Sequence, residues 1–366
     1  VESTLINDNA LPCTNNMPWV KPGIATWTYW ANNHGAKDYD VIKKYVDLAA
    51  VMHVPYVLID AEWDEMGDGR SVEDAIRYAK DHGVETFIWY NSSIGWVDGA
   101  PGPKDRLNTE ANRAKEFAWL TALGVKGIKV DFFSGENNAN IKYMHELLES
   151  AAKNKMMVNF HGVTLPRGWQ RTYPNLITCE AVYGEEWYNN VPTFTDKAAA
   201  HNAILPYTRN IVGSMDYTPC AFSNSQNPHI TTAAHELALT CLFESGMLNL
   251  PDSPESYLAQ PQEILDLIRT MPTTWDDIVF LNGYPGESAI IARRKGANWY
   301  IAGINGTNNS TTLSFKIDRL KNLGKKITIY EDSGKAERPW CISSSKTVPT
   351  TFDCLANGGF IIVVEP

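Results

Sequence analysis

Eight short apolar segments alternate with helix-like segments between residues 23 and 250, and this alternation constrains the fold more than any other feature. A buried parallel strand followed by a helix is the repeating unit of α/β proteins, and eight such units predict a (β/α)8 TIM barrel over residues 23–272. An open doubly wound sheet is the competing architecture. The expected strands are residues 23–30, 56–60, 86–91, 127–133, 156–160, 176–180, 211–215 and 247–250.

Helical periodicity supports the same reading. Apolar residues recur at spacings of three and four within residues 39–53, 108–123, 138–154 and 231–245. Another helix is expected to begin at Ser71, because Ser71 with Asp74 three positions later forms a variant of the capping box. Neither GxGxxG nor GxxxxGK[ST] follows any of the strands, which disfavours nucleotide binding.

The sequence changes character near Pro272. Strand-like runs separated by Gly-, Asn-, Ser- and Lys-rich turns predict an antiparallel β-sandwich over residues 273–366. We expect this domain to pack against the barrel and stabilise it, with carbohydrate binding as the less favoured role. Residues 1–22 show little periodicity and contain three prolines, so they are interpreted as an extended lead-in or linker.

Composition excludes several classes of function. The formal charge of -10 argues against a polyanionic partner such as nucleic acid. No apolar stretch reaches the length of a membrane span. The six cysteines form no CxxC pair and the histidines no HExxH motif, which disfavours a zinc site. Cys341 and Cys354 are close enough in sequence to bridge a hairpin. Twelve Trp and sixteen Tyr are compatible with a sugar-binding cleft, although core packing is the more usual use.

Carboxylates and aromatic residues follow most of the predicted strands, at the end where barrel enzymes keep their chemistry. Glycoside hydrolysis needs two carboxyl groups, one protonated and one ionised. Asp131, at the end of a barrel strand, suits the nucleophile, and Glu186, in the loop after the sixth strand, is the best placed partner. Lys129 lies two residues before Asp131 and is expected to keep it ionised. A structural Lys129–Asp131 ion pair and a solvated Glu186 are the alternatives.

Other strand-end residues are candidates for contacts with a sugar. Asp60 could bind a hydroxyl, and His161 is expected to face Asp131 and the substrate, although a strand-end histidine is more often structural. Trp27 and Trp30 are three residues apart, so only one of them is expected to reach a ligand. Residues 180–186 contain several carboxylates that could hold Ca²⁺, although such loops are usually only solvated.

These motifs together resemble glycoside hydrolase family 97. The resemblance rests on Asn-Phe-His-Gly at residues 159–162, Arg-Thr-Tyr-Pro-Asn at 171–175, Glu180 with Glu186, and Gly-Ile-Lys-Val-Asp at 127–131. Residues 22–27 and 252–254 are similar to its first- and eighth-strand motifs. The resemblance extends from about residue 20 to the C-terminus.

The family contains a retaining α-galactosidase branch and an inverting α-glucoside hydrolase branch. The retaining branch carries an Asp after strand four and a Gly after the strand-five His, and Asp131 and Gly162 match this pattern. The resemblance therefore implies Asp131 as nucleophile, Glu186 as general acid/base, and Ca²⁺ near the site with Glu180 and Glu186 as ligands. Lys129, Asp60, His161 and Trp27 would orient the sugar. α-Glucosidase activity, a non-catalytic sugar-binding barrel, and the related families 27, 36 and 31 are the alternatives.

The family also has a large N-terminal β-sandwich that contributes a metal-ligating carboxylate. This chain lacks it unless residues 1–22 are its remnant, so we expect either a fragment or a partner that supplies the domain. The expected substrate is an oligosaccharide, with no nucleic-acid or membrane partner. By resemblance to the family, the expected location is periplasmic or secreted.

Overall fold

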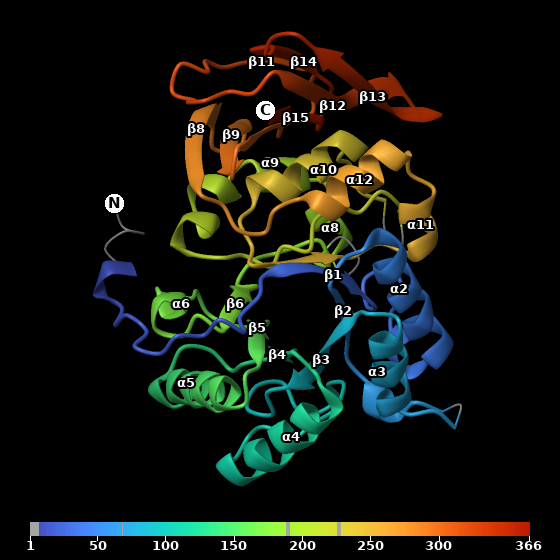
Figure 1. Ribbon diagram of the computed structural model, residues 1–366, viewed down its shortest axis with the longest axis vertical. Helices are drawn as coiled ribbons and strands as arrows, with labels where there is room; N and C mark the ends of the chain where they lie inside the picture. Colours follow the sequence, from blue (N-terminus) through green and yellow to red (C-terminus); the bar gives the residue numbers. More distant parts are fainter. Residues whose placement is uncertain (1–6, 68, 188–190, 225–227) are drawn as a thin grey trace. The chain divides into compact units, whose positions relative to one another are not determined.

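The computed structural model in Figure 1 describes residues 7–67, 69–187, 191–224 and 228–366. The chain divides into two compact units. The first comprises Val1–Gly184, Val212–Thr218 and Ser245–Arg269. The second comprises Glu185–Ile211, Pro219–Glu244 and Thr270–Pro366. Each unit is therefore assembled from segments that are separated in the sequence.

Parallel strands form the sheet of the first unit, in the order β6-β5-β4-β3-β2-β1-β7. Nearly all of their residues are buried, because parallel strands of this type are covered on both faces. Within the described residues the sheet has seven strands, and the α/β, TIM-like fold class is confirmed. The strands are β1 (Gly23–Trp27), β2 (Tyr56–Ile59), β3 (Glu85–Asn91), β4 (Gly127–Asp131), β5 (Met157–Phe160), β6 (Leu176–Cys179) and β7 (Met247–Leu250).

Helices surround this sheet (Figure 1). The predicted capping box opens α3, where the Ser71 backbone N–H donates to Asp74 Oδ2 at 3.0 Å. No helix in the described part of the chain has both the length and the apolar character needed to cross a membrane. The elements are η1 (Gly35–Lys37), α2 (Tyr39–Met52), η2 (Trp63–Glu65), α3 (Val72–Asp81), α4 (Glu110–Leu123), α5 (Asn138–Lys153), α6 (Trp169–Thr172), α11 (Pro254–Leu258) and α12 (Gln262–Thr270).

The predicted seventh strand, residues 211–215, is wrong. Its apolar start belongs to the 3₁₀-helix η4 (Arg209–Val212), and the Ile211 side chain is 46% exposed. Gly213 follows with φ of 144°, which interrupts extended backbone. A short apolar run therefore indicated a buried strand where the chain forms a helical turn. The segment predicted as the eighth strand is β7, which pairs with β1.

The segment after Gly213 nevertheless connects β6 to the chain that leads into β7. Ser214 Oγ donates to Ile177 O at 3.0 Å and accepts from the Gly246 backbone N–H at 2.8 Å. The Asp216 backbone N–H donates to Cys179 O at 3.0 Å. A side-chain hydroxyl thus replaces much of the backbone pairing that a regular strand would provide here.

The segment ahead of β1 lies along α6. The Cys13 backbone N–H donates to Arg171 O at 2.8 Å, and Thr172 Oγ1 donates to Leu11 O at 2.5 Å. Part of the predicted lead-in is thereby attached to the first unit, while residues 1–6 of it lie outside the described residues.

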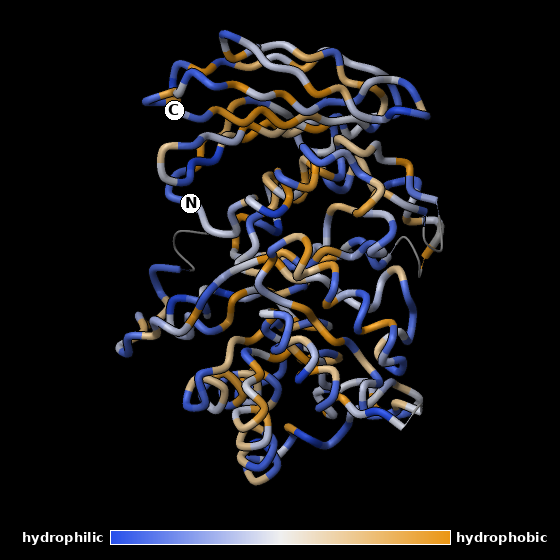
Figure 2. Tube along the Cα trace, turned by 45° about the vertical axis from the view of Figure 1, so that its right-hand side comes forward, coloured by the Kyte–Doolittle hydropathy of each residue, from blue (hydrophilic) through white to orange (hydrophobic). Residues whose placement is uncertain are grey.

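The second unit contains a large antiparallel sheet in the order β13-β12-β15-β10-β9-β8, and a small sheet that pairs β11 with β14. Polar and apolar stretches alternate along these strands (Figure 2). The two sheets share a core in which Phe352 stacks on Phe360 with ring centroids 3.9 Å apart. The strands are β8 (Asp277–Tyr284), β9 (Ser288–Lys295), β10 (Asn298–Asn305), β11 (Thr311–Ser314), β12 (Lys326–Lys335), β13 (Arg338–Ser345), β14 (Thr351–Cys354) and β15 (Gly359–Glu365).

The long helix of this unit, α10 (Ala233–Leu242), packs on β10 and β15. All of its residues from Ala234 to Leu242 are buried, which explains the apolar composition that predicted a helix here. The shorter helical elements are α8 (Pro192–Thr195), α9 (Ala198–Asn202) and η3 (Leu205–Tyr207).

No disulfide joins any of the six cysteines, all of which lie within the described ranges. Cys341 and Cys354 lie on β13 and β14, which are not neighbours. The partner of β13 is β12, and the partner of β14 is β11. The hairpin that a disulfide could have bridged is therefore absent from the described strands.

Candidate active site

Asp131 ends β4 with its carboxylate held by two donors. The Phe132 backbone N–H donates to Oδ1 at 2.7 Å, and the Trp89 indole N–H donates to Oδ2 at 3.2 Å. The side chain lies at the carboxyl end of a parallel strand and is 9% exposed. Donors at both oxygens fix the orientation of the carboxylate, as a nucleophile requires.

The backbone after Asp131 is fixed in an uncommon conformation. Phe132 has φ of 64°, in the left-handed region that a bulky residue rarely adopts. Two hydrogen bonds hold it there: Ser92 Oγ donates to Phe132 O at 2.8 Å, and the Phe133 backbone N–H donates to Gly162 O at 3.0 Å. Such strain is typical of functional sites when the surroundings determine the geometry.

Lys129, Asp60 and Trp27 form a buried cluster across β4, β2 and β1. Lys129 Nζ lies 2.9 Å from Asp60 Oδ2, and the Trp27 indole N–H donates to the same oxygen at 2.6 Å. Lys129 Nζ also lies 4.6 Å from the centroid of the Trp27 ring. Lys129 thus forms an ion pair with Asp60, and its expected effect on Asp131 stays a prediction. Trp30, the other candidate, is buried as well.

His161 follows β5 and lies between two carboxylates. Its Nε2 is 2.7 Å from Asp216 Oδ2, and its Nδ1 is 3.6 Å from Glu180 Oε1. Burial and the charge of Lys129 lower the pKa of His161, but Glu180 and Asp216 outweigh them and raise it to about 9. The two carboxylates therefore favour the protonated form of the imidazole.

Asp216 accepts hydrogen bonds from side chains on two strands, β5 and β7. Besides His161, the side-chain amides of Asn159 on β5 and Asn249 on β7 donate to its Oδ2, at 2.6 and 2.7 Å. Burial alone would raise the pKa of Asp216, but the contacts with His161 and Asn159 lower it below its usual value. Asp216 therefore acts as a buried anion that orients His161.

Glu180 follows β6 and approaches the same region. The Gly162 backbone N–H donates to Glu180 Oε2 at 2.7 Å, and Gly162 has φ of 50°. Burial raises the pKa of Glu180; the charge of His161 opposes this, and the charge of Asp131 adds to it. A carboxylate that is disfavoured as an anion by burial and by a neighbouring anion is a suitable ligand for a hard cation.

Glu186 belongs to the second unit, so no position relative to Asp131 is assigned to it. Its side chain is partly buried, and the preceding residue, Glu185, is fully buried. The prediction that Glu186 serves as acid/base and metal ligand stays a prediction. Trp27, Asp60, Lys129, His161, Glu180 and Asp131 all lie in the first unit.

One aromatic residue of the site had no sequence signal. Trp96, in the loop after β3, is 52% exposed, and its ring meets that of Phe132 edge to face at 4.9 Å. The loop packs tightly: a Cβ atom on Gly95 would lie 1.9 Å from Phe132 O. The Asn91 side-chain amide also donates to Trp96 O at 3.1 Å. A fixed, exposed Trp beside the residue after Asp131 is a surface on which a sugar could stack.

The chain matches two family models. Glycoside hydrolase 97 matches residues 19–182, and the model described as "Glycosyl-hydrolase 97 C-terminal, oligomerisation" matches residues 274–365. The chain belongs to glycoside hydrolase family 97. The resemblance found in the sequence motifs is thereby confirmed.

The chain is similar to two curated proteins and to a solved structure, among others. A probable retaining alpha-galactosidase of Streptomyces bingchenggensis is 37% identical over 82% of this chain and 46% of its own length. The retaining alpha-galactosidase of Bacteroides thetaiotaomicron is 29% identical over 79% of this chain and 45% of its own. A beta-arabinopyranosidase crystal structure has a TM-score of 0.91 and 33% identity, covering 98% of this chain and 58% of that one. The family 97 chain described here thus spans under half the length of these curated relatives.

Proposed function

We propose that this chain carries the catalytic centre of a retaining glycoside hydrolase that releases terminal α-linked galactose from oligosaccharides. The observation that carries the proposal is Asp131, oriented at the end of β4 by Trp89 and the Phe132 backbone. The 37% identity to a probable retaining alpha-galactosidase supports the substrate class.

The reaction would proceed by double displacement. An Asp131 oxygen attacks the anomeric carbon and forms a β-galactosyl ester, while Glu186 protonates the departing glycosidic oxygen. Glu186 then removes a proton from water, which attacks the anomeric carbon and releases Asp131 as a carboxylate. The galactose is freed as its α-anomer, because two inversions restore the configuration. The two carboxyl groups would need to lie about 5–5.5 Å apart.

The charged groups around Asp131 would hold the sugar. In this proposal the Lys129–Asp60 pair, His161 and Trp27 orient the hydroxyls and the ring face. The hydrogen bonds that Lys129 and Trp27 donate to Asp60, and the contact of His161 with Asp216, leave these side chains little freedom, so their orientation would change little on binding.

Retention is tested with p-nitrophenyl α-galactoside by proton NMR. The α-anomer is expected to appear first, and a β-anomer would overturn the double displacement. In Asp131→Gly, added azide should restore release of p-nitrophenol and give β-galactosyl azide, because azide replaces the carboxylate as nucleophile. Rescue without this azide product would remove the assignment of Asp131.

A second candidate substrate follows from the beta-arabinopyranosidase structure, which aligns with 98% of this chain. A β-L-arabinopyranoside has the stereochemistry of an α-D-galactopyranoside and lacks only the hydroxymethyl group at C5. A missing methylene costs about 1–3 kcal/mol in a hydrophobic pocket, and a missing hydroxyl that the pocket hydrogen-bonds costs more. Comparing kcat/KM for the two p-nitrophenyl glycosides decides between the substrates, and the α-glucoside tests recognition at C4.

We also propose that Ca²⁺ binds beside Asp131 with Glu180 as a ligand and, by resemblance to the family, Glu186 as another. The raised pKa of Glu180 supports this, because a divalent cation would offset the repulsion from Asp131. Ca²⁺ would supply positive charge near the leaving oxygen. Ca²⁺ should raise the melting temperature more than Mg²⁺ does, and Glu180→Gln should remove the difference. An equal response to both ions in the unmodified protein would contradict the proposal.

The family also motivates two proposals about context. We propose that a β-sandwich N-terminal to the barrel completes the site in the full-length enzyme, and that the enzyme acts in the periplasm or is secreted. Adding an N-terminal β-sandwich of a family 97 enzyme, in trans, should raise kcat/KM if the first proposal holds. Cell fractionation tests the second.

A further inference from the structure

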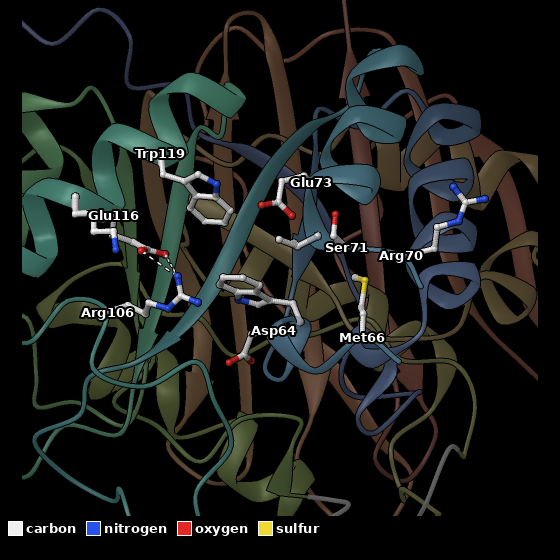
Figure 3. A pocket seen from close by; sticks show the side chains of 11 residues that line it. Asp64, Met66, Arg70, Ser71, Glu73, Arg106, Glu116 and Trp119 are labelled. Carbon is white, nitrogen blue, oxygen red and sulfur yellow. Dashed lines mark hydrogen bonds and ion pairs between the residues drawn. The ribbon is translucent and has the colours of Figure 1, made fainter. Parts of the chain in front are cut away.

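A cavity of about 360 Å³ lies in the first unit, and Asp131 is not among the residues that line it. Figure 3 shows it between α4, which supplies Glu116 and Trp119, and the start of α3, which supplies Ser71 and Glu73. The volume is within the range of small-molecule sites in proteins. None of the residues of the candidate active site lines it.

One wall of the cavity is aromatic and rigid. The rings of Trp63 and Trp119 stack with centroids 5.8 Å apart and planes inclined by 21°. Trp63 is 4% exposed, and its indole N–H donates to Trp89 O at 2.7 Å. Trp119 is partly exposed. The buried ring thus supports the exposed one, which is the arrangement of an aromatic surface for stacking.

The remaining wall is polar and balanced in charge. Glu116 is only 4% exposed, and both of its carboxylate oxygens have partners. Arg106 Nη1 lies 3.3 Å from Glu116 Oε2, and the Tyr90 hydroxyl donates to Glu116 Oε1 at 2.8 Å. The full charged lining consists of three cations and three carboxylates: Arg70, Arg106, Lys115, Asp64, Glu73 and Glu116. A charged ligand gains little from such a lining, whereas a neutral ligand with many hydroxyls finds both donors and acceptors.

We propose that this cavity is a second carbohydrate site, which binds a neutral oligosaccharide by stacking a pyranose on Trp119 and bonding its hydroxyls to Arg106 and Glu73. The site would hold a substrate chain on the enzyme while the active site acts on its end, and would raise the local concentration of that end. The role of holding a substrate chain and the choice of a galactosyl probe rest on the proposed function. The site itself requires no catalysis.

The test resolves the two sites by NMR. The twelve tryptophans are labelled as 5-fluorotryptophan in Asp131→Asn protein, so that no probe is consumed. Trp→Phe variants assign the signals of Trp63, Trp119, Trp96 and Trp340. A neutral α-galactosyl trisaccharide is then titrated. The signals of Trp63 and Trp119 are expected to shift along one saturation curve, and Trp96 along another. Trp340, on β13, serves as the matched control and should not move.

Variants test the contacts. Glu73 lies on the surface of α3. Glu73→Ala should raise the dissociation constant obtained from the Trp119 signal about tenfold, equivalent to about 1.4 kcal/mol, and leave the one obtained from the Trp96 signal unchanged. The proposal of a second site would be overturned if the Trp63 and Trp119 signals did not shift, or if both followed the same saturation curve as Trp96. If Trp119 responds in this way but the protein with its native Asp131, supplied with the N-terminal domain, turns over no glycoside, the cavity is supported and the proposed function is contradicted, so the two failures are distinguishable.

Discussion

A Cβ atom placed on Gly162 would lie 2.9 Å from Oδ1 of Asp131 and 2.7 Å from the Phe132 backbone nitrogen. The space that a side chain at position 162 would occupy is therefore taken by the candidate nucleophile and its donor. The sequence motifs paired a Gly after His161 with an Asp at position 131, and this contact gives a steric reason why the two belong together. A Glu at position 162 would require the carboxylate of Asp131 to move or be absent.

We expect Gly162→Ala to lower kcat at least about 100-fold, because a displacement of roughly 1 Å at a reacting group has that effect. The left-handed backbone adds a cost of about 1–2 kcal/mol in stability. Gly83→Ala is the matched control: Gly83 has φ of 73° with open space around it. It should lose comparable stability and keep its activity. Full activity in Gly162→Ala would show that the contact does not position Asp131.

Trp89→Phe removes the indole donor from Asp131 Oδ2 and keeps an aromatic ring in place. A hydrogen bond to a charged group contributes about 1.5–3 kcal/mol. We therefore expect kcat to fall about 10- to 100-fold with little change in KM, since the indole orients the nucleophile. Steady-state kinetics with the aryl galactoside measure this, and Trp275→Phe controls for loss of a tryptophan elsewhere. A change confined to KM would assign Trp89 to substrate binding instead.

Trp96→Ala should affect substrates according to the size of their leaving group. The exposed ring beside Phe132 is placed to stack on a leaving sugar, so KM for a galactosyl trisaccharide should rise about tenfold. α-Galactosyl fluoride, whose leaving group is a single atom, should be hydrolysed as before. An equal loss of kcat/KM on both substrates would indicate that Trp96 positions Asp131 and does not bind the leaving sugar.

His235 on α10 predicts a pH dependence of stability in the second unit. It is fully buried, and burial lowers its pKa to about 3. Between pH 6.5 and 3 the unfolded chain binds a proton that the folded protein excludes. His235 therefore costs no stability above pH 6.5, and the stability falls as the pH drops through this window, by up to about 1.4 kcal/mol per pH unit.

Urea unfolding of wild type and His235→Asn at several pH values measures this effect. Glu236 and Glu244, whose pKa values burial raises, titrate in the opposite sense, so only the difference between the two proteins is assigned to His235. The difference should shrink on acidification. His53→Asn, at an exposed position that Asn also tolerates, is the control and should leave the profile unchanged. Parallel profiles for wild type and His235→Asn would contradict the prediction.

Most of the barrel could be predicted because buried parallel strands are short apolar runs, and all seven strands from β1 to β7 show such runs. It failed at residues 211–215, where Ile211 and Val212 supply the same signal in a 3₁₀-turn and Ser214 makes the connection through its hydroxyl. A pattern of apolar residues cannot distinguish a backbone ladder from a contact made by a side chain.

The sequence predicted which strand ends carry the residues of the candidate site, but it did not predict which of their side chains contact one another. Asp131, His161 and Glu180 were named because the carboxyl ends of barrel strands converge. The pairing of Lys129 with Asp60 joins β4 to β2, and depends on side-chain reach that spacing along one strand does not contain. Trp96 lies in a loop, where no periodicity marks it.

The packing of α10 on β10 and β15 has a consequence for dissecting this protein. The helix precedes β7 in the chain, yet it packs on two strands of the large C-terminal sheet. A truncation near residue 272 would therefore leave an apolar helix without its sheet on one fragment and a sheet without its helix on the other. Separate expression of the two parts should begin by transplanting Ala233–Leu242, because a single cut cannot yield two soluble halves.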